Sequence, residues 1–369
     1  MTIVRNPLRA RGVALLVVML MVFAMAVIVG AFAYTMRIEG RLAMRTQSEG
    51  DLEWMGRSGV EMAKWVLSLS RQIPGEQGYD GLNQFWAGGP GPTNLLENVF
   101  EGVSLIDVPL GDGTISIHII DTDRKLNINT VAQRSPKLLE LILQICGAVG
   151  TDPADSVTAI RDWIDPDDQS GPGASAESDF YLGLDPPYVA KNGPIDDISE
   201  LLKIRGITPE LYWGPRGRGV GSGSALGTSQ FGKVTDLGQS VAGTVGLADV
   251  FCAISAGQVN INTAPFSVLV LACGGNENMA RNIIEQRSGL DQQEGTWDDT
   301  PARSMGEIAR LQGAPLAPDQ ASPMATFSVS SSTFEIQVEA TLGPLRRRFT
   351  AVVRRVGLRD MPILTFRRD

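Results

Sequence analysis

The first quarter of the chain carries one long, uninterrupted apolar run. No charged residue occurs from Gly12 to Met36, which is long enough for a helix to span a bilayer. From Leu52 to Leu69 the apolar residues recur at steps of three and four, the spacing of one helix face. The pattern predicts a single helix from Val13 to about Leu69, roughly 85 Å long at ~1.5 Å per residue. Pro74-Gly75 is expected to end it.

The residues before this run indicate its orientation. Arg5, Arg9 and Arg11 precede it, so the positive-inside rule predicts a cytoplasmic N-terminus and an exported body. A cleaved secretory signal is the competing interpretation, with Ala31-Phe32-Ala33 as its cleavage site. The apolar run is longer than the core of an ordinary signal, so a retained membrane helix is favoured.

Alternation of apolar and polar residues predicts β-strands at two distant places. Segment 114–120 has isoleucine at every second position, which is typical of one strand. Two alternating stretches within 334–353 flank Gly343-Pro344, as in a β-hairpin. Most of the helical periodicity lies between these strands, so a helical insertion within a sheet domain is expected. The Gly/Ser-rich stretch 214–232 is predicted to be a loop and has no phosphate-binding motif.

The tetrad Asn-Ile-Asn-Thr occurs at 127–130 and again at 260–263. A helical stretch, a second helix and a short helix that runs into glycine follow each copy. This common order predicts a diverged internal repeat of helical units. We expect Asn129/Thr130 and Asn262/Thr263 to cap the first helix of each unit, and the isoleucine between the asparagines to be buried.

The acidic charge of the chain argues against binding of nucleic acids. The net charge is −9, whereas phosphate contacts require clustered Lys and Arg. Segment 198–207, ISELLKIRGI, is also typical of a helix-hairpin-helix that binds DNA backbones. The acidic surroundings and the predicted export favour a packing role for its apolar residues instead. The basic run 346–348 is expected to be a solvated hairpin edge that faces an acidic surface.

Histidine and cysteine are too sparse for a zinc site, which draws on these residues at close spacing. A Ser-His-Asp triad would have to use His118, the single histidine, which is expected to face solvent from strand 114–120. Cys252 and Cys273 could pair after export, but their spacing does not decide this.

One acidic segment is the best candidate for chemistry. Six carboxylates fall within eighteen residues: Asp162, Asp165, Asp167, Asp168, Glu177 and Asp179. Such a cluster repels itself unless it is solvated or neutralised, and Ca²⁺ takes six to eight oxygens from flexible loops. A solvated acidic loop, helix capping and paired carboxylates for hydrolysis remain open alternatives. No EF-hand pattern is present.

A short basic leader, a glycine, a long apolar helix and then a head resemble the type IV pilin and pseudopilin class. The resemblance implies that a prepilin peptidase cuts after Gly12 and methylates Val13. The class usually has glutamate at the fifth mature position, where this chain has Val17. A subunit that lacks this glutamate resembles one that begins or caps a filament.

Several segments in one order are similar to the general secretion protein K family of type II secretion: RGVALLVVML, GRSGVEMAKWVL, DTDRKLNINT, DWIDPDD, LDPPY, ISELLKIRGITPELY and VNINTAP. The resemblance implies an α+β fold with a pilin-like α/β head, an antiparallel sheet and a large helical insert. The expected divisions are a leader at 1–12, a transmembrane and N-terminal helix at 13–70, a head at 71–126 and 259–369, and an insert at 127–258. Calcium binding in the family further implies Asp165, Asp167, Glu177 and Asp179 as ligands.

The resemblance also implies a function without catalysis. The chain is expected to be a minor pseudopilin at the tip of the type II secretion pseudopilus. Its partners would be other minor pseudopilins, the inner-membrane platform and the prepilin peptidase. It would cross the inner membrane of a Gram-negative bacterium once, with its head in the periplasm. A type IV pilus-like minor pilin and a membrane-anchored periplasmic enzyme are the alternatives.

Overall fold

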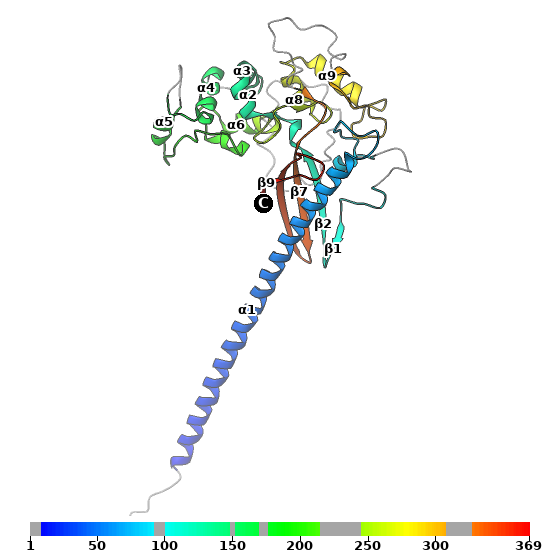
Figure 1. Ribbon diagram of the computed structural model, residues 1–369. Helices are drawn as coiled ribbons and strands as arrows, with labels where there is room; N and C mark the ends of the chain where they lie inside the picture. Colours follow the sequence, from blue (N-terminus) through cyan, green and yellow to red (C-terminus); the bar gives the residue numbers. More distant parts are fainter. Residues whose placement is uncertain (1–8, 92–99, 148–151, 170–175, 215–244, 308–326) are drawn as a thin grey trace, which may run out of the picture.

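A long helix and an antiparallel sheet form the frame of the molecule (Figure 1). The computed structural model describes residues 9–91, 100–147, 152–169, 176–214, 245–307 and 327–369. The predicted leader residues 1–8 and most of the predicted loop 214–232 lie outside this set. The fold confirms the expected α+β class with a long apolar N-terminal helix.

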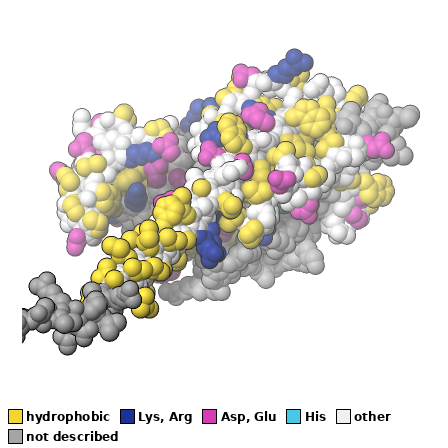
Figure 2. Space-filling model, turned by 90° about the horizontal axis from the view of Figure 1, so that it is seen from below, with side chains coloured by type: hydrophobic (Ala, Val, Ile, Leu, Met, Phe, Trp, Pro, Cys, Tyr) yellow, Lys and Arg dark blue, Asp and Glu magenta, His cyan; other side chains and the backbone are white. Residues whose placement is uncertain are grey.

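Helix α1 (Arg9–Ser70) confirms the predicted continuous helix. Its side chains from Val13 to Gln47 are exposed, and hydrophobic side chains cover the protruding part in Figure 2. From Val13 onward, α1 contains a stretch long and apolar enough to cross a membrane. Its second part turns one face to the sheet, where Leu52, Val60 and Leu67 are fully buried. The chain leaves the helix through a turn in which Gly75 has φ +87°, a conformation that favours glycine.

The sheet has the strand order β1-β2-β7-β8-β9, and all neighbours are antiparallel. Its strands are β1 (Val108–Leu110), β2 (Gly113–Asp121), β7 (Thr333–Leu342), β8 (Leu345–Arg354) and β9 (Ile363–Arg368). Ile117 lies opposite Val338, which lies opposite Phe349, so one row of buried side chains crosses the predicted strand and both arms of the predicted hairpin. Strands β2 and β7 pair directly although more than two hundred residues separate them, so the rest of the fold is inserted between them.

Two glycines let α1 approach the sheet closely. A Cβ atom on Gly56 would lie 2.5 Å from Cδ2 of Phe349, and one on Gly59 would lie 2.5 Å from Cγ1 of Val338. Real Cβ atoms do not approach other atoms this closely. Glycine is therefore needed on this helix face although it disfavours helix by about 1 kcal/mol relative to alanine.

Between β2 and β7 the chain is mainly helical, and we call this part the helical region. Figure 1 shows it above and beside the upper end of the sheet. Its helices are η2 (Thr122–Arg124), α2 (Ile128–Arg134), α3 (Pro136–Ile145), α4 (Pro153–Ile164), α5 (Ser178–Leu182), η3 (Ile198–Lys203), α6 (Pro209–Trp213), α7 (Leu247–Val250), α8 (Phe266–Ala272) and α9 (Glu277–Arg287). Two short parallel ladders join β3 (Leu126–Asn127) to β4 (Phe251–Cys252) and β5 (Val259–Asn260) to β6 (Phe327–Ser328). A further short helix, η1 (Phe85–Ala87), packs below α1.

The described residues form two separate hydrophobic cores. One joins α1 to the inner face of the sheet, and the other runs from Leu126 to Phe327 through the helical region. By packing, the helical region therefore extends well past 258, where the sequence placed the end of the insert. The physical reason is that the second repeat unit buries its apolar face against the first, with α8 in contact with α3.

The two Asn-Ile-Asn-Thr tetrads occupy equivalent places, which supports the predicted repeat. The second asparagine of each tetrad binds both polar groups of one distant peptide. Asn129 accepts from the N–H of Ile195 at 2.8 Å and donates to its carbonyl at 3.0 Å. Asn262 makes the same pair of bonds with Ala302, both at 2.9 Å. A short turn follows each of these asparagine–peptide pairs. In it, a glutamate side chain accepts from backbone N–H three or four residues earlier: Glu200 in the first unit and Glu307 in the second.

The expected capping roles of Asn129/Thr130 and Asn262/Thr263 are wrong. Asn127, and not Asn129, is the N-cap of α2 and accepts from the N–H of Thr130 at 3.0 Å. In the second unit Asn260 accepts from the N–H of Asn262 at 3.0 Å in a turn, and the N-cap of α8 is Pro265, which makes no side-chain capping bond. Position and alternation could not separate these roles, because the partners of the second asparagine lie 40 and 66 residues further along the chain.

Three buried carboxylates join the helical region to the sheet. Asp121 ends β2 and accepts from Thr263 and Ser331, both at 2.5 Å. Asp123 accepts from the backbone N–H groups of Ala256 at 2.7 Å and Ser332 at 2.7 Å. Asp80 accepts from the N–H of Ser331 at 2.8 Å, so the point where the chain leaves the sheet is fixed to the point where it returns.

We expect Gly59→Ala to destabilise the packing of α1 on the sheet, although alanine is normally the better helix former. Overpacking of a filled core typically costs about 1–3 kcal/mol, which exceeds the propensity gain. Hydrogen exchange of peptides from β7 and β8 should become faster in the full-length protein in detergent. Gly50→Ala is the matched control, since nothing lies within 4 Å of its added Cβ. Equal protection in both variants would contradict the close-approach argument.

Candidate metal centre

The acidic segment begins where α4 ends. Asp152 caps the first turn of α4, and Pro153 occupies its first position. Val157, Ile160 and Trp163 bury one face of this helix in the core of the helical region. Pro166 follows and disfavours helical backbone at Asp165, which takes the extended values φ −73° and ψ 158°. The helix therefore stops at Asp165 and directs the next residues back across its own end.

The other side of the site is set by α5. Glu177 precedes this helix, and its side chain makes no capping hydrogen bond. Tyr181 of α5 is fully buried and packs edge-on against Trp163 at a centroid distance of 5.3 Å. The N–H of Ala176 donates to Oδ2 of the buried Asp162 at 3.0 Å. These contacts anchor Glu177 opposite the end of α4.

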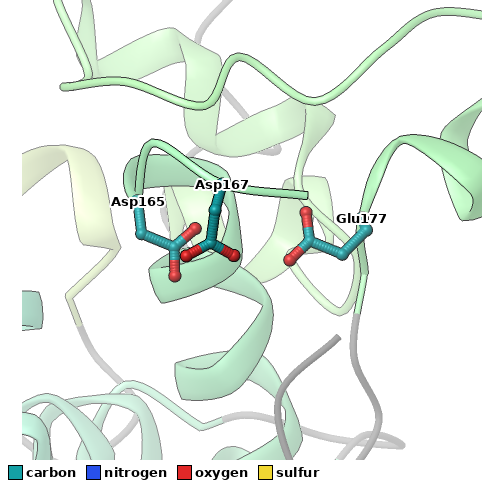
Figure 3. Close-up of side chains that lie close together, drawn as sticks. All are labelled: Asp165, Asp167 and Glu177. Atoms are coloured by element: carbon teal, nitrogen blue, oxygen red, sulfur yellow. The ribbon is translucent and has the colours of Figure 1, made fainter. Parts of the chain in front are cut away.

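Three predicted ligands come together in this arrangement (Figure 3). Carboxylate oxygens of Asp165, Asp167 and Glu177 all lie within 4.8 Å of one another. Glu177 is only 5% exposed, and neither of its carboxylate oxygens has a hydrogen-bond partner among the described residues. Oδ1 of Asp165 is also buried without a partner. Buried carboxylate oxygens without donors are costly, which makes these three residues suited to a cation.

The electrostatics of the cluster point the same way. Burial, followed by repulsion from Asp162 and Asp165, raises the pKa of Glu177 to about 7. Burial and the neighbouring Asp167 also raise the pKa of Asp165 above its ordinary value. Without a positive charge nearby, the carboxylates therefore resist ionisation. A divalent cation would reverse this preference, because its charge favours the ionised forms.

The remaining acids of the segment have other positions. Asp179, the fourth predicted ligand, is an exposed residue of α5 outside the three-carboxylate group. Asp168 accepts from the N–H of Ser178 at 3.2 Å, and hydrogen bonds from Ser178 lower its pKa. Asp162 positions Ala176 and was not among the predicted ligands. In the sequence, the position of Asp162 on the buried face of α4 was the only sign of this role.

The equivalent loop of the second repeat unit binds its own carboxylates. Gly193 donates to the carbonyl of Trp163 in the first unit, as Thr300 does to Arg287 in the second, so residues 288–299 correspond to the acidic segment. There Asp298 accepts from the N–H of Leu290 at 2.8 Å, and Asp299 accepts from that of Gly295 at 2.7 Å. Within the described residues, the group of close carboxylates suited to a metal belongs to the first unit.

Other candidates from the sequence lie apart from this site. Gly12 and Val13 are both in α1, and the side chain of Val13 is exposed. Cys252 and Cys273 are free thiols. Leu201 and Ile204 of the segment 198–207 are buried in the helical core, in line with a packing role. Arg346 pairs with Glu339, and Arg347 pairs with Glu49 of α1, as expected for a hairpin edge against acidic groups.

Comparison with known proteins gives the same family by several routes. Residues 124–213 match the family model described as Type II secretion system (T2SS), protein K. The chain is 32% identical to type II secretion system protein K of Pectobacterium carotovorum subsp. carotovorum over 55% of this chain and 60% of that protein. It is 23% identical to the Aeromonas hydrophila protein K over 93% of this chain and 92% of that protein.

The chain is similar to the type II secretion system protein K family. The matches to protein K of Klebsiella pneumoniae and of Pectobacterium each span 60% of the relative's length, whereas the Aeromonas match is nearly complete. The fold is also similar to a chain in the crystal structure of the GspK-GspI-GspJ complex from the enterotoxigenic Escherichia coli type 2 secretion system. That match has a TM-score of 0.56 at 18% identity and covers 89% of this chain and 99% of the other.

The protein should lose stability at its acidic segment as the pH rises in the absence of metal. Glu177 has a pKa near 7 in the folded state and 4.5 as its ordinary value, so the folded state binds more protons between these two pH values. The contribution of Glu177 to stability is therefore fully present below about pH 4.5 and is lost as pH rises to about 7. Glu177→Gln should flatten this decline.

Thermal unfolding of the chelator-treated protein across this window measures the effect through the fluorescence of its tryptophans, which include Trp163 beside the site. Asp112→Asn is the control, because Asp112 is exposed in the turn between β1 and β2, outside the helical region. The same pH slope in Glu177→Gln and wild type would contradict the assignment of the decline to Glu177.

Proposed function

We propose that this protein is a minor pseudopilin at the tip of the type II secretion pseudopilus. The observation that carries the proposal is the match to the Aeromonas protein K over 93% of this chain, which includes both the apolar helix and the head. The similar fold comes from the crystal structure of the GspK-GspI-GspJ complex. By this analogy, the partners of the present chain are other minor pseudopilins.

The exposed half of α1 supports an anchor in the inner membrane. Its uncharged side chains cannot remain in water at this density, and the described head does not cover them. With the arginines on the cytoplasmic side, the head lies in the periplasm. A prepilin peptidase then removes residues 1–12 and methylates Val13, after which the inner-membrane platform can move the helix outward.

Val17 gives the subunit its place in the filament. It lies in the exposed apolar part of α1, where the related class carries a glutamate. A carboxylate there would neutralise the terminal amine of a neighbouring subunit in a bundle of low dielectric, where a lone charge is costly. A chain with valine cannot supply this charge to a subunit ahead of it, so it begins the assembly. The helical region beside the sheet adds bulk that suits a cap.

The three-carboxylate group supports a calcium ion held by Asp165, Asp167 and Glu177, with further oxygens from the loop or from water. Calcium accepts several carboxylates at irregular geometry, whereas magnesium requires near-ideal octahedral ligands. Its role is structural: it would neutralise the loop that joins α4 to α5. We therefore propose no catalytic activity for this site, and a membrane-anchored enzyme has no specific observation in its favour.

Cleavage between Gly12 and Val13 is the first test of this function. Mass spectrometry of the protein extracted from membranes should show a mature chain that begins with N-methylated Val13. Gly12→Leu should keep the leader, because the peptidase acts after glycine. Gly30→Leu is the matched control, since Gly30 lies in the same apolar run with open space around it.

In a strain whose own copy is deleted, the wild-type chain and Gly30→Leu should restore export of type II substrates, and Gly12→Leu should leave them in the periplasm. An unprocessed wild-type chain that still supports export would contradict the pseudopilin assignment. Normal export in the deletion strain would contradict the role in secretion.

Calcium should raise the thermal unfolding midpoint of the metal-free protein. A ligand that binds only the folded state adds stability that grows with its concentration, about 2.7 kcal/mol at one hundred times Kd. Magnesium should have a smaller effect. Asp165→Asn combined with Asp167→Asn should abolish the response, and Asp179→Asn should keep most of it. An unchanged calcium response in the double variant would show that these acids form a solvated surface.

A further inference from the structure

A polar pocket opens where the end of α1 meets the sheet and the second repeat unit. This junction pocket has a volume of about 450 Å³, within the size range of about 300–1,000 Å³ typical of ligand sites. It is lined by Arg71 after α1, by Ala256 and Gln258, by four serines in β6 and between β6 and β7, and by residues 355–358 after β8. Segments from four distant parts of the chain thus converge on one hollow.

The lining of the pocket is cationic in an otherwise acidic protein. Of its eleven lining residues two are arginines, Arg71 and Arg355, and none is acidic. Both arginines pair with the same carboxylate, since Oδ2 of Asp80 lies 2.9 Å from Arg71 and 2.5 Å from Arg355. One carboxylate therefore serves two guanidinium groups, and Nη1 of Arg355 has no acceptor among the described residues.

The carboxylates behind the pocket do not cancel this charge. Asp121 and Asp123 lie beneath the serines and accept from Oγ of Ser331 and from the N–H of Ser332. Burial, followed by the charge of Asp123, raises the pKa of Asp121 to about 7, and the half-buried Arg124 interacts electrostatically with Asp121. Near neutral pH this pair thus carries less than two full negative charges.

The rim of the pocket has a different character. Val356 and Leu358 line it and are 66% and 51% exposed. They lie in a turn held by the carbonyl of Asp360, which accepts from the N–H groups of Val356 at 3.0 Å and Gly357 at 3.2 Å. The turn therefore presents two apolar side chains beside the cationic floor. The serines add hydroxyl groups, which suit an oxyanion.

We propose that the junction pocket binds the terminal carboxylate of a peptide whose last side chain is apolar. The carboxylate pairs with Arg71 and accepts hydrogen bonds from the serine hydroxyls. The side chain of Arg71 is 22% exposed and can donate to a second partner besides Asp80. The apolar side chain packs on Val356 and Leu358. This is a site for a protein terminus in addition to the assembly role of the chain, and it does not depend on calcium.

The test uses N-acetyl-leucine as the probe with the full-length protein in detergent. Methyl NMR signals of Val356 and Leu358 should shift as the probe is added. The amide analogue N-acetyl-leucinamide should leave them unchanged, because it has no charge to pair with Arg71. Arg71→Gln should weaken binding by about tenfold, the loss typical of one charge-assisted hydrogen bond. Arg71→Lys should restore part of it.

Arg359→Gln is the matched control: it removes the same charge from the turn at the rim, but Arg359 does not line the pocket. It should alter binding by less than about twofold, as screening of an exposed charge predicts. If both arginine variants weaken binding of the probe equally, the effect is general electrostatic attraction and the proposed site is wrong. Binding of inorganic phosphate in place of N-acetyl-leucine would overturn the assignment to a peptide terminus, and so would equal binding of the amide.

Discussion

The fold depends on how a large helical region is held to the sheet that it interrupts. The sheet can form only if β2 and β7 remain neighbours. The chain between them leaves at the end of β2 and returns beside it at the start of β7. Asp121 and Asp123 at the exit bind the serines at the return, and Asp80 closes the group from the end of α1. Each carboxylate is buried and hydrogen-bonded, so loss of either side would leave a buried polar group unpaired. The junction is therefore fixed in one geometry.

The two hydrophobic cores lie on either side of this junction and have separate roles. The core below it packs α1 onto the sheet through Gly56 and Gly59, and so connects the head firmly to the helix that carries it. The core above it stacks two repeat units that each clamp a distant peptide with one asparagine. The three-carboxylate group and the junction pocket share no residue, so each can be mutated without changing the other.

Comparison of the two repeat units shows what distinguishes the three-carboxylate group of the first unit. Both units have an acidic loop after their second main helix. In the second unit, backbone N–H groups within the loop satisfy Asp298 and Asp299. In the first unit, Oδ1 of Asp165 and both carboxylate oxygens of Glu177 are buried without donors, and burial, followed by repulsion from neighbouring acids, raises the pKa of both residues. What distinguishes the two loops is therefore the supply of donors, and not the number of acids.

The sequence by itself determined the long helix, the strand at 114–120, the hairpin around Gly343-Pro344 and the repeat, because periodicity and turn residues are local properties of the chain. It also placed Asp165, Asp167 and Glu177 in one segment, since proline ends α4 at a definite residue. Only the tertiary structure decided that Asp179 lies outside the three-carboxylate group, that Asn127 and not Asn129 caps α2, and that the second unit packs with the first. It alone brought Arg71 and Arg355 to one pocket. These features depend on contacts between residues far apart in sequence, where neither periodicity nor spacing carries information.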